Sequence, residues 1–238
     1  NLPVNFRAIL MADSSSYFNF YRAAQTPSES NNRLWFINLL RMLVALLFMT
    51  LLTDLAIVMF WPDGLQLLKE TYQKEVQYLS ANIDRQTTDL ISQWVNTAYD
   101  WTFIKTGIQG YLYSGGNQLT GNLISGMWPM IQGAMIGFQI FMIRLSVLIL
   151  MVPFILLIML VLGSDGYLEW YRRRTEGARE SAFIYHRSKH MVSWSMAGMW
   201  FFYLVPPFAI DPIYIFLPTI ILLGLFSRLS VQFFKKYI

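Results

Sequence analysis

An uncharged, apolar run over residues 145–163 is followed by three consecutive arginines, Arg172, Arg173 and Arg174. A run of about 20 apolar residues is long enough to cross a bilayer as one helix. Three guanidinium groups cannot follow it into hydrocarbon, and arginine-rich flanks mark the cytoplasmic side of a membrane. The sequence therefore predicts an integral membrane protein in which the segment after this run lies in the cytoplasm.

The composition agrees with this prediction. Of the 238 residues, 55% are hydrophobic and 13% are charged, whereas soluble domains carry roughly 25% charged residues. The net charge of +4 is mild, and no single run is basic enough for a DNA-binding arm. We therefore attribute the positive charge to the membrane-flanking bias and expect no direct nucleic-acid binding. The chain has no cysteine, which excludes disulfides and thiolate metal sites.

The apolar runs predict an all-α fold with four transmembrane helices and both termini in the cytoplasm. The first run is too long for a cleaved signal peptide, so we expect it to be retained. The predicted order is a cytoplasmic segment over 1–33, a span over 34–61, a periplasmic amphipathic helical segment over 62–121, a segment over 122–144 leading into the second span over 145–163, a cytoplasmic basic loop over 164–190, spans over 191–210 and 212–230, and a cytoplasmic tail over 231–238. In the amphipathic segment, steps of three and four predict that the apolar face of the helix consists of Leu65, Leu68, Tyr72, Val76, Leu79 and Ile83, followed by Leu90, Trp94, Ala98 and Trp101.

The segment over 122–144 allows two interpretations. It is uncharged up to Arg144 but contains several glycines and a proline. Because no turn residues separate it from the second span, we expect either one long helix or an interfacial helix that bends into that span. Gly133 and Gly137 match the small-xxx-small pattern by which helices pack closely in membranes, although such a pattern also arises by chance.

Asp54 and Arg144 are the two charged side chains predicted to lie within apolar segments. A charge near the middle of a bilayer costs about 2.5–3.5 kcal/mol on insertion scales and points to a functional or structural site. Antiparallel neighbouring spans would place both residues at similar depth, so we predict that they form an ion pair. The alternative is a pathway for protons or other ions.

The sequence gives no indication of catalysis or of a bound cofactor. His186 and His190 are one helical turn apart, with Arg187, Ser188 and Lys189 between them. The positive charges of Arg187 and Lys189 would repel a metal ion. The chain also lacks a P-loop, a G-x-S-x-G nucleophile motif, an H-E-x-x-H zinc motif and a dinucleotide-binding fingerprint. We therefore expect a protein that is not an enzyme and has neither a metal nor a cofactor.

Three stretches of the C-terminal half resemble the integrating conjugative element membrane proteins, a family long described as a domain of unknown function. These stretches are 176–190, 203–208 with the Asp-Pro turn after it, and 233–237. The family shows a Gly-x-x-Arg-Glu-Ser-x-Phe-x-Tyr-His motif after an apolar span, then two further spans and a Phe-Lys-Lys-Tyr-like end. The residues that match the motif are Gly177, Arg179, Glu180, Ser181, Phe183, Tyr185 and His186.

The resemblance implies an inner-membrane component of bacterial conjugation that works beside the coupling ATPase of a type IV secretion system, in a homo- or hetero-oligomer. The basic loop over 164–190, which contains this motif and is called the motif loop below, would then be the docking surface for that ATPase. Charge-assisted contacts would come from Arg179 and Glu180, and Phe183, Tyr185 and His186 would complete the surface. The alternative function is a small channel or transporter subunit that uses Asp54 and Arg144.

Overall fold

The structure is a computed structural model that describes residues 29–113, 118–176 and 182–234, and within these ranges every regular element is a helix. The elements are α2 (Glu29–Phe60), α3 (Gly64–Asn82), α4 (Arg85–Tyr99), the π-helical turn η1 (Asp100–Ile104), α5 (Ile108–Tyr113), α6 (Gln118–Thr175), α7 (Ala182–Leu204) and α8 (Pro212–Gln232). The predicted all-α class is confirmed. The chain divides into a unit that ends at Val44 and a unit that begins at Ala45, and the second unit contains the candidate site.

Within the residues that the structure describes, three helical segments are long and apolar enough to cross a membrane: Phe36–Phe60 in α2, Gly126–Thr175 in α6, and Pro212–Gln232, which is all of α8. They correspond to three of the four predicted spans. The fourth prediction, 191–210, falls on α7, which begins at Ala182, ends at Leu204 and does not belong to this apolar group.

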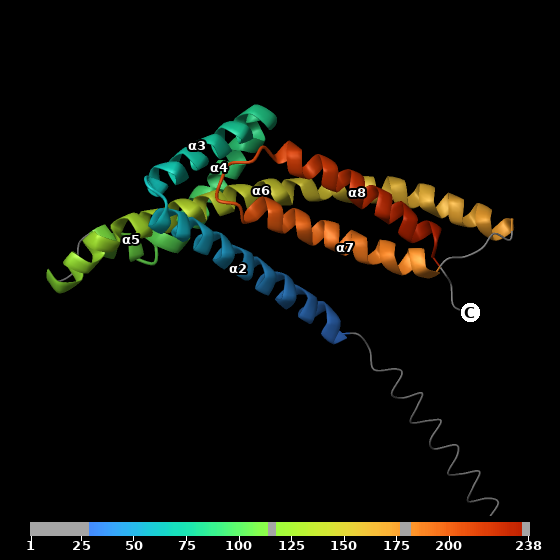
Figure 1. The fold of residues 1–238 in the computed structure, drawn as a ribbon, viewed down its shortest axis with the longest axis horizontal. Helices are drawn as coiled ribbons and strands as arrows, with labels where there is room; N and C mark the ends of the chain where they lie inside the picture. The colour runs from blue at the N-terminus through green and yellow to red at the C-terminus, as the bar shows by residue number, and fades with distance from the viewer. Residues whose placement is uncertain (1–28, 114–117, 177–181, 235–238) are drawn as a thin grey trace, which may run out of the picture. The chain divides into compact units, whose positions relative to one another are not determined.

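Helix α6 is one continuous helix of 58 residues, which is the first of the two alternatives that the sequence left open for residues 122–144. At 1.5 Å per residue it is about 87 Å long, nearly three times the roughly 30 Å of bilayer hydrocarbon. Helices α3 and α4 pack on its N-terminal half, where Phe138 meets Phe103 of η1 edge to face. Helix α8 packs on its C-terminal half, and α7 packs on α8 (Figure 1).

The segment between α2 and α6 is amphipathic as predicted, but its buried faces differ from the predicted ones. In α3 the buried stripe is Gly64, Leu68, Thr71, Glu75 and Leu79, where the hydrophobic spacing favoured Tyr72 and Val76 in place of Thr71 and Glu75. In α4 the buried residues are Ile91 and Val95. The predicted α4 stripe fails because Leu90 and Trp94 are exposed by 46% and 51%.

Local sequence explains where the helices stop. Asp63 adopts a left-handed conformation with φ of 60° between α2 and α3. A side chain at Gly64 would collide with the carbonyl of Ile57, so the close return of the chain requires glycine here. At the start of α8, the Asp211 carboxylate accepts a hydrogen bond of 3.0 Å from the backbone N–H of Ile213, and proline occupies the first helical turn.

Candidate functional site: a buried arginine that holds the loop between two helices

Arg144 is the centre of the most elaborate polar site in the described part of the chain. It lies near the middle of α6, and its side chain is fully buried. Its Nε and Nη2 donate to Oε1 of Glu75 at 2.9 and 2.6 Å, and Nη2 also donates to the Phe208 carbonyl at 2.7 Å. Its Nη1 donates to the carbonyls of Pro206 at 2.5 Å and Leu204 at 3.4 Å. These contacts use all five donors of the guanidinium group.

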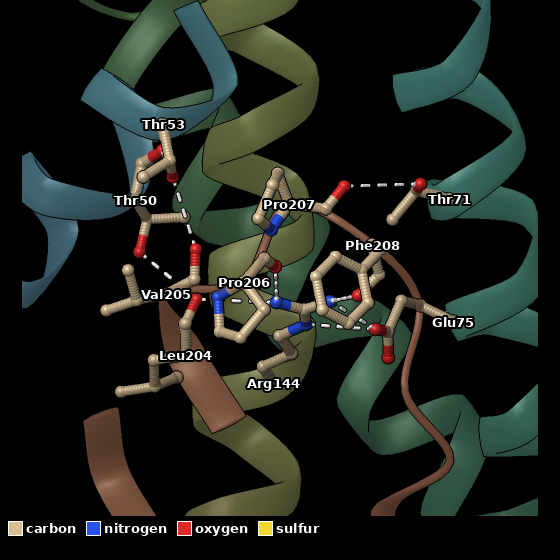
Figure 2. A network of polar contacts seen from close by, with 10 residues as sticks. All are labelled: Thr50, Thr53, Thr71, Glu75, Arg144, Leu204, Val205, Pro206, Pro207 and Phe208. Atoms are coloured by element: carbon tan, nitrogen blue, oxygen red, sulfur yellow. Dashed lines mark hydrogen bonds and ion pairs between the residues drawn. The ribbon is translucent and has the colours of Figure 1, made fainter. Parts of the chain in front are cut away.

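The backbone acceptors of Arg144 belong to the end of α7 and to the loop between α7 and α8, and threonines from two other helices bind the same stretch of backbone (Figure 2). The Thr50 hydroxyl of α2 donates to the Leu204 carbonyl at 3.1 Å, and Thr53 donates to the Val205 carbonyl at 3.1 Å. Thr71 of α3 donates to the carbonyl of Pro207 at 3.5 Å. We refer to these three threonines, Arg144, Glu75 and the five carbonyls of residues 204–208 as the carbonyl clamp.

The sequence of the loop explains why it requires such a clamp. The last carbonyls of any helix have no partner within that helix. Here Pro206 and Pro207 end α7, and because proline has no N–H it offers no backbone donor to neighbouring carbonyls. An unsatisfied carbonyl costs about 1–3 kcal/mol where it is fully buried, as Leu204 and Val205 are, and less at Pro206, Pro207 and Phe208, which are only partly covered. Side chains from α2, α3 and α6 supply the missing donors and thereby hold four helices together at one level.

Glu75 is the counterion of Arg144, and the side chains of both residues are at most 2% exposed. Burial raises the pKa of Glu75, while the adjacent guanidinium of Arg144 opposes that increase. The pair therefore carries a substantial desolvation cost, which the five hydrogen bonds of Arg144 partly offset.

The predicted ion pair between Asp54 and Arg144 is replaced by the pair between Arg144 and Glu75. Among the described residues, Asp54 forms no ion pair, and its Oδ2 is buried without a hydrogen-bond partner. The similar depth expected for Asp54 and Arg144 did not predict the partner of Arg144. The partner comes from α3, which lies outside the apolar runs, packs along α6 and brings Glu75 to Arg144. Glu75 could have been found in the sequence, because it lies four residues from both Thr71 and Leu79 on one helical face.

Gly133 and Gly137 lie where α6 contacts α2. A methyl group at Gly133 would come within 2.8 Å of Cγ2 of Val58, and one at Gly137 would collide with Oδ2 of Asp54. The two glycines therefore provide the space into which the α2 side chains fit.

Of the motif loop predicted over 164–190, the residues up to Thr175 belong to α6 and those from Ala182 onward belong to α7, while Arg179 and Glu180 fall outside the described residues. Phe183 is 73% exposed at the start of α7. The Tyr185 ring packs edge to face against Phe234, and His186 is exposed beside it. The Trp170 indole of α6 donates to the Phe234 carbonyl at 2.8 Å, so the ends of three helices meet here.

This arrangement can fix the position of the loop and the packing of the helices around it. The donors of Arg144 are all engaged, and no group of three or more histidine, cysteine or carboxylate side chains could hold a metal ion within residues 29–113, 118–176 and 182–234.

Comparison with known proteins identifies the family. No curated protein and no solved structure matches this chain. A family model described as "IncC plasmid conjugative DNA transfer protein DtrJ-like" matches residues 60–235, which is most of the chain and includes α3 to α8. The expected role in conjugative transfer is confirmed, whereas the family is that of an IncC plasmid protein and its description does not mention integrating elements. The chain therefore belongs to the DtrJ-like family of conjugative DNA transfer proteins.

Proposed function

We propose that this protein is a non-catalytic, multi-pass subunit of the inner membrane that supports conjugative DNA transfer by docking the coupling ATPase of a type IV secretion system. The observation that carries the proposal is that the family match contains, in full, two helical segments that are long and apolar enough to cross a membrane, Gly126–Thr175 and Pro212–Gln232. Such a subunit would hold a partner in place while the partner supplies the energy of ATP.

The C-terminal half of α6 has a basic residue near each end, and the distance between them matches the thickness of a membrane. From Arg144 to Arg172 is 28 residues, or about 42 Å of helix, which matches the roughly 40–45 Å of a bilayer with its headgroups. The positive-inside rule then places the three terminal arginines of α6 in the cytoplasm and the carbonyl clamp near the periplasmic headgroups. In this placement α2, α6, α7 and α8 all cross the membrane, and α3 and α4 lie on the periplasmic side.

The docking surface would be the cytoplasmic start of α7. The hydrogen bond from Trp170 to Phe234 and the ring contact between Tyr185 and Phe234 tie the ends of α6, α7 and α8 together. They leave Phe183 exposed. A large aromatic side chain on a fixed surface is a typical anchor for a protein partner.

The proposal can be tested by affinity purification from conjugating donor cells. We expect the tagged protein to retain the coupling ATPase in mild detergent and Phe183→Ala, combined with Tyr185→Ala, to reduce its recovery at least tenfold, since an interface anchor is worth about 2 kcal/mol or more. Tyr214→Ala is the matched control, because Tyr214 is 76% exposed at the far end of the membrane-crossing helices, at the start of α8. Equal recovery with all variants would refute docking at this surface.

The channel alternative receives less support. Arg144 has no free donor to bind a passing anion, and its charge is matched by Glu75. A pore would also require a polar lining, whereas the groove on the α6 side of α8 is lined mainly by apolar residues such as Met151 and Phe216.

A further inference from the structure

An open apolar groove runs along the line where α7 meets α8. Two cavities of about 200 and 400 Å³ share Met191 and Phe226, so they form one continuous groove. The α7 residues that line it recur at steps of three and four, which is one face of a helix. The α7 lining consists of Phe183, Ile184, Arg187, Ser188, Met191, Trp194, Ser195, Gly198, Met199 and Phe202.

The groove has an apolar body and one basic end. Arg187 is the only charged side chain among its lining residues, and it lies at the end next to the motif loop. Large aromatic side chains stand along the groove: Trp194 is 74% exposed and Phe202 is 63% exposed. Between them Ser195 and Gly198 leave room at the floor, since a methyl group at Gly198 would touch only the Phe202 ring, at 3.9 Å.

We propose that this groove binds an anionic phospholipid, with one acyl chain between α7 and α8 and the phosphate on the guanidinium of Arg187. This inference rests on the proposed membrane location. The stretch of α7 from Arg187 to Phe202 covers about 22 Å, enough for the roughly 15 Å depth of one hydrocarbon leaflet. With the start of α7 in the cytoplasm, the arginine lies at the headgroup level of the inner leaflet, where anionic lipids attract basic side chains.

The shape of the groove favours a lipid chain over another helix. Helices in membranes approach each other through small residues at the contact surface, but Trp194 and Phe202 rise beside this groove and would keep a second backbone away. A flexible acyl chain can follow an irregular floor between such rings. Two acidic side chains at the same end are already engaged, because Asp165 pairs with Arg228 at 2.6 Å and Glu169 pairs with Arg173 at 3.5 Å.

Trp194 provides a direct measurement of lipid in the groove. The full chain is reconstituted in phosphatidylcholine vesicles that contain brominated phosphatidylglycerol or brominated phosphatidylcholine, and tryptophan quenching is recorded. Because the chain has 8 tryptophans, the difference between the unmodified protein and Trp194→Phe isolates the signal of Trp194. We expect about a fivefold preference for phosphatidylglycerol, as one basic side chain at an anionic surface provides.

Two variants separate the headgroup from the chain. Arg187→Gln should abolish the preference for phosphatidylglycerol while quenching by both lipids persists, and Lys189→Gln is the control, since it removes a neighbouring charge that does not line the groove. Gly198→Leu should fill the groove and remove the quenching of Trp194 at little cost to the helix, because leucine is a better helix former than glycine.

Several outcomes would overturn the lipid site. Equal quenching by the two lipids in the unmodified protein, or an unchanged preference in Arg187→Gln, would show that the groove does not select an anionic headgroup. Loss of the quenching on addition of single-stranded DNA would assign the groove to DNA. A dimer that Gly198→Leu dissociates would assign it to a second copy of the chain. Flotation with the vesicles tests the membrane location separately. A protein that does not float with any vesicle refutes the proposed location, whereas one that floats without lipid preference refutes only the groove.

Discussion

Replacing Arg144 with methionine tests the carbonyl clamp most directly. Methionine keeps much of the length and the apolar stem of arginine but removes all five donors. The carbonyls of Pro206 and Phe208 would lose their side-chain donor, whereas the carbonyl of Leu204 would keep Thr50. The variant therefore isolates what the guanidinium group contributes to the loop.

The expected loss of stability follows from these contacts. Removing one partner of a buried ion pair typically costs about 3–5 kcal/mol in all. The carbonyls of Pro206 and Phe208 are only partly buried, so their loss of a donor adds less than the roughly 1–3 kcal/mol of a fully buried carbonyl. We therefore expect Arg144→Met to lower the free energy of unfolding by about 3–5 kcal/mol. Arg144→Lys should lie between this variant and the unmodified protein, because an ammonium group has three donors and cannot match the planar fork of arginine.

The assay is unfolding of the purified protein in mixed micelles, followed by far-UV circular dichroism and by proteolysis within the loop over residues 205–211. A double-mutant cycle with Glu75→Met separates the ion pair from the carbonyls. The double variant should be more stable than the sum of the single losses predicts, by about 0.5–3 kcal/mol, because it leaves no unpaired buried charge. A loss below 0.5 kcal/mol for Arg144→Met, with the loop still protected, would refute the clamp.

Three further predictions concern the surroundings of Arg144. Gly137→Ala should destabilise the protein by about 1–3 kcal/mol in thermal unfolding, because the added methyl group would collide with the carboxylate of Asp54. The control is Gly126→Ala, which adds a methyl group in open space on the same helix and should be neutral or stabilising. Thr53→Val should lower the free energy of unfolding by about 1–3 kcal/mol, because the Val205 carbonyl would lose its side-chain donor. Thr50→Val should lower it less, because the Leu204 carbonyl would keep the donor from Arg144. Equal losses in denaturant titrations would contradict this difference. Burial raises the pKa of Glu75, so the folded state retains its proton to higher pH than the unfolded chain. The free energy of unfolding should therefore decrease as the pH rises from the ordinary value of 4.5 toward the folded-state pKa, and Glu75→Gln should flatten that pH profile.

Two residues of the motif show that a sequence can single out side chains without predicting their contacts. Phe183, a predicted docking residue, is exposed at the start of α7. However, the contact of Tyr185 with Phe234 joins residues that are 49 positions apart in the chain. No local pattern predicts such a contact, because it depends on the packing of α7 against α8.

The buried faces of α3 and α4 show a similar limit. Spacing of three and four residues predicted that this segment is helical, and it is. It did not predict the rotation of each helix, since the predicted stripe of α4, with Trp94, is exposed and the neighbouring stripe with Ile91 is buried. The contact with α6 determines the rotation, because one helix can present only one face to a neighbour.

The sequence by itself determined the helical class, the three apolar segments and the resemblance to conjugation proteins, because these depend on the character of consecutive residues and on local spacing. Only the tertiary structure decided that Glu75, and not Asp54, is the partner of Arg144. The reason is physical: a buried guanidinium group must satisfy all its donors, and the acceptors that do so come from α3 and from the loop after α7, which lie 69 and about 60 residues away along the chain.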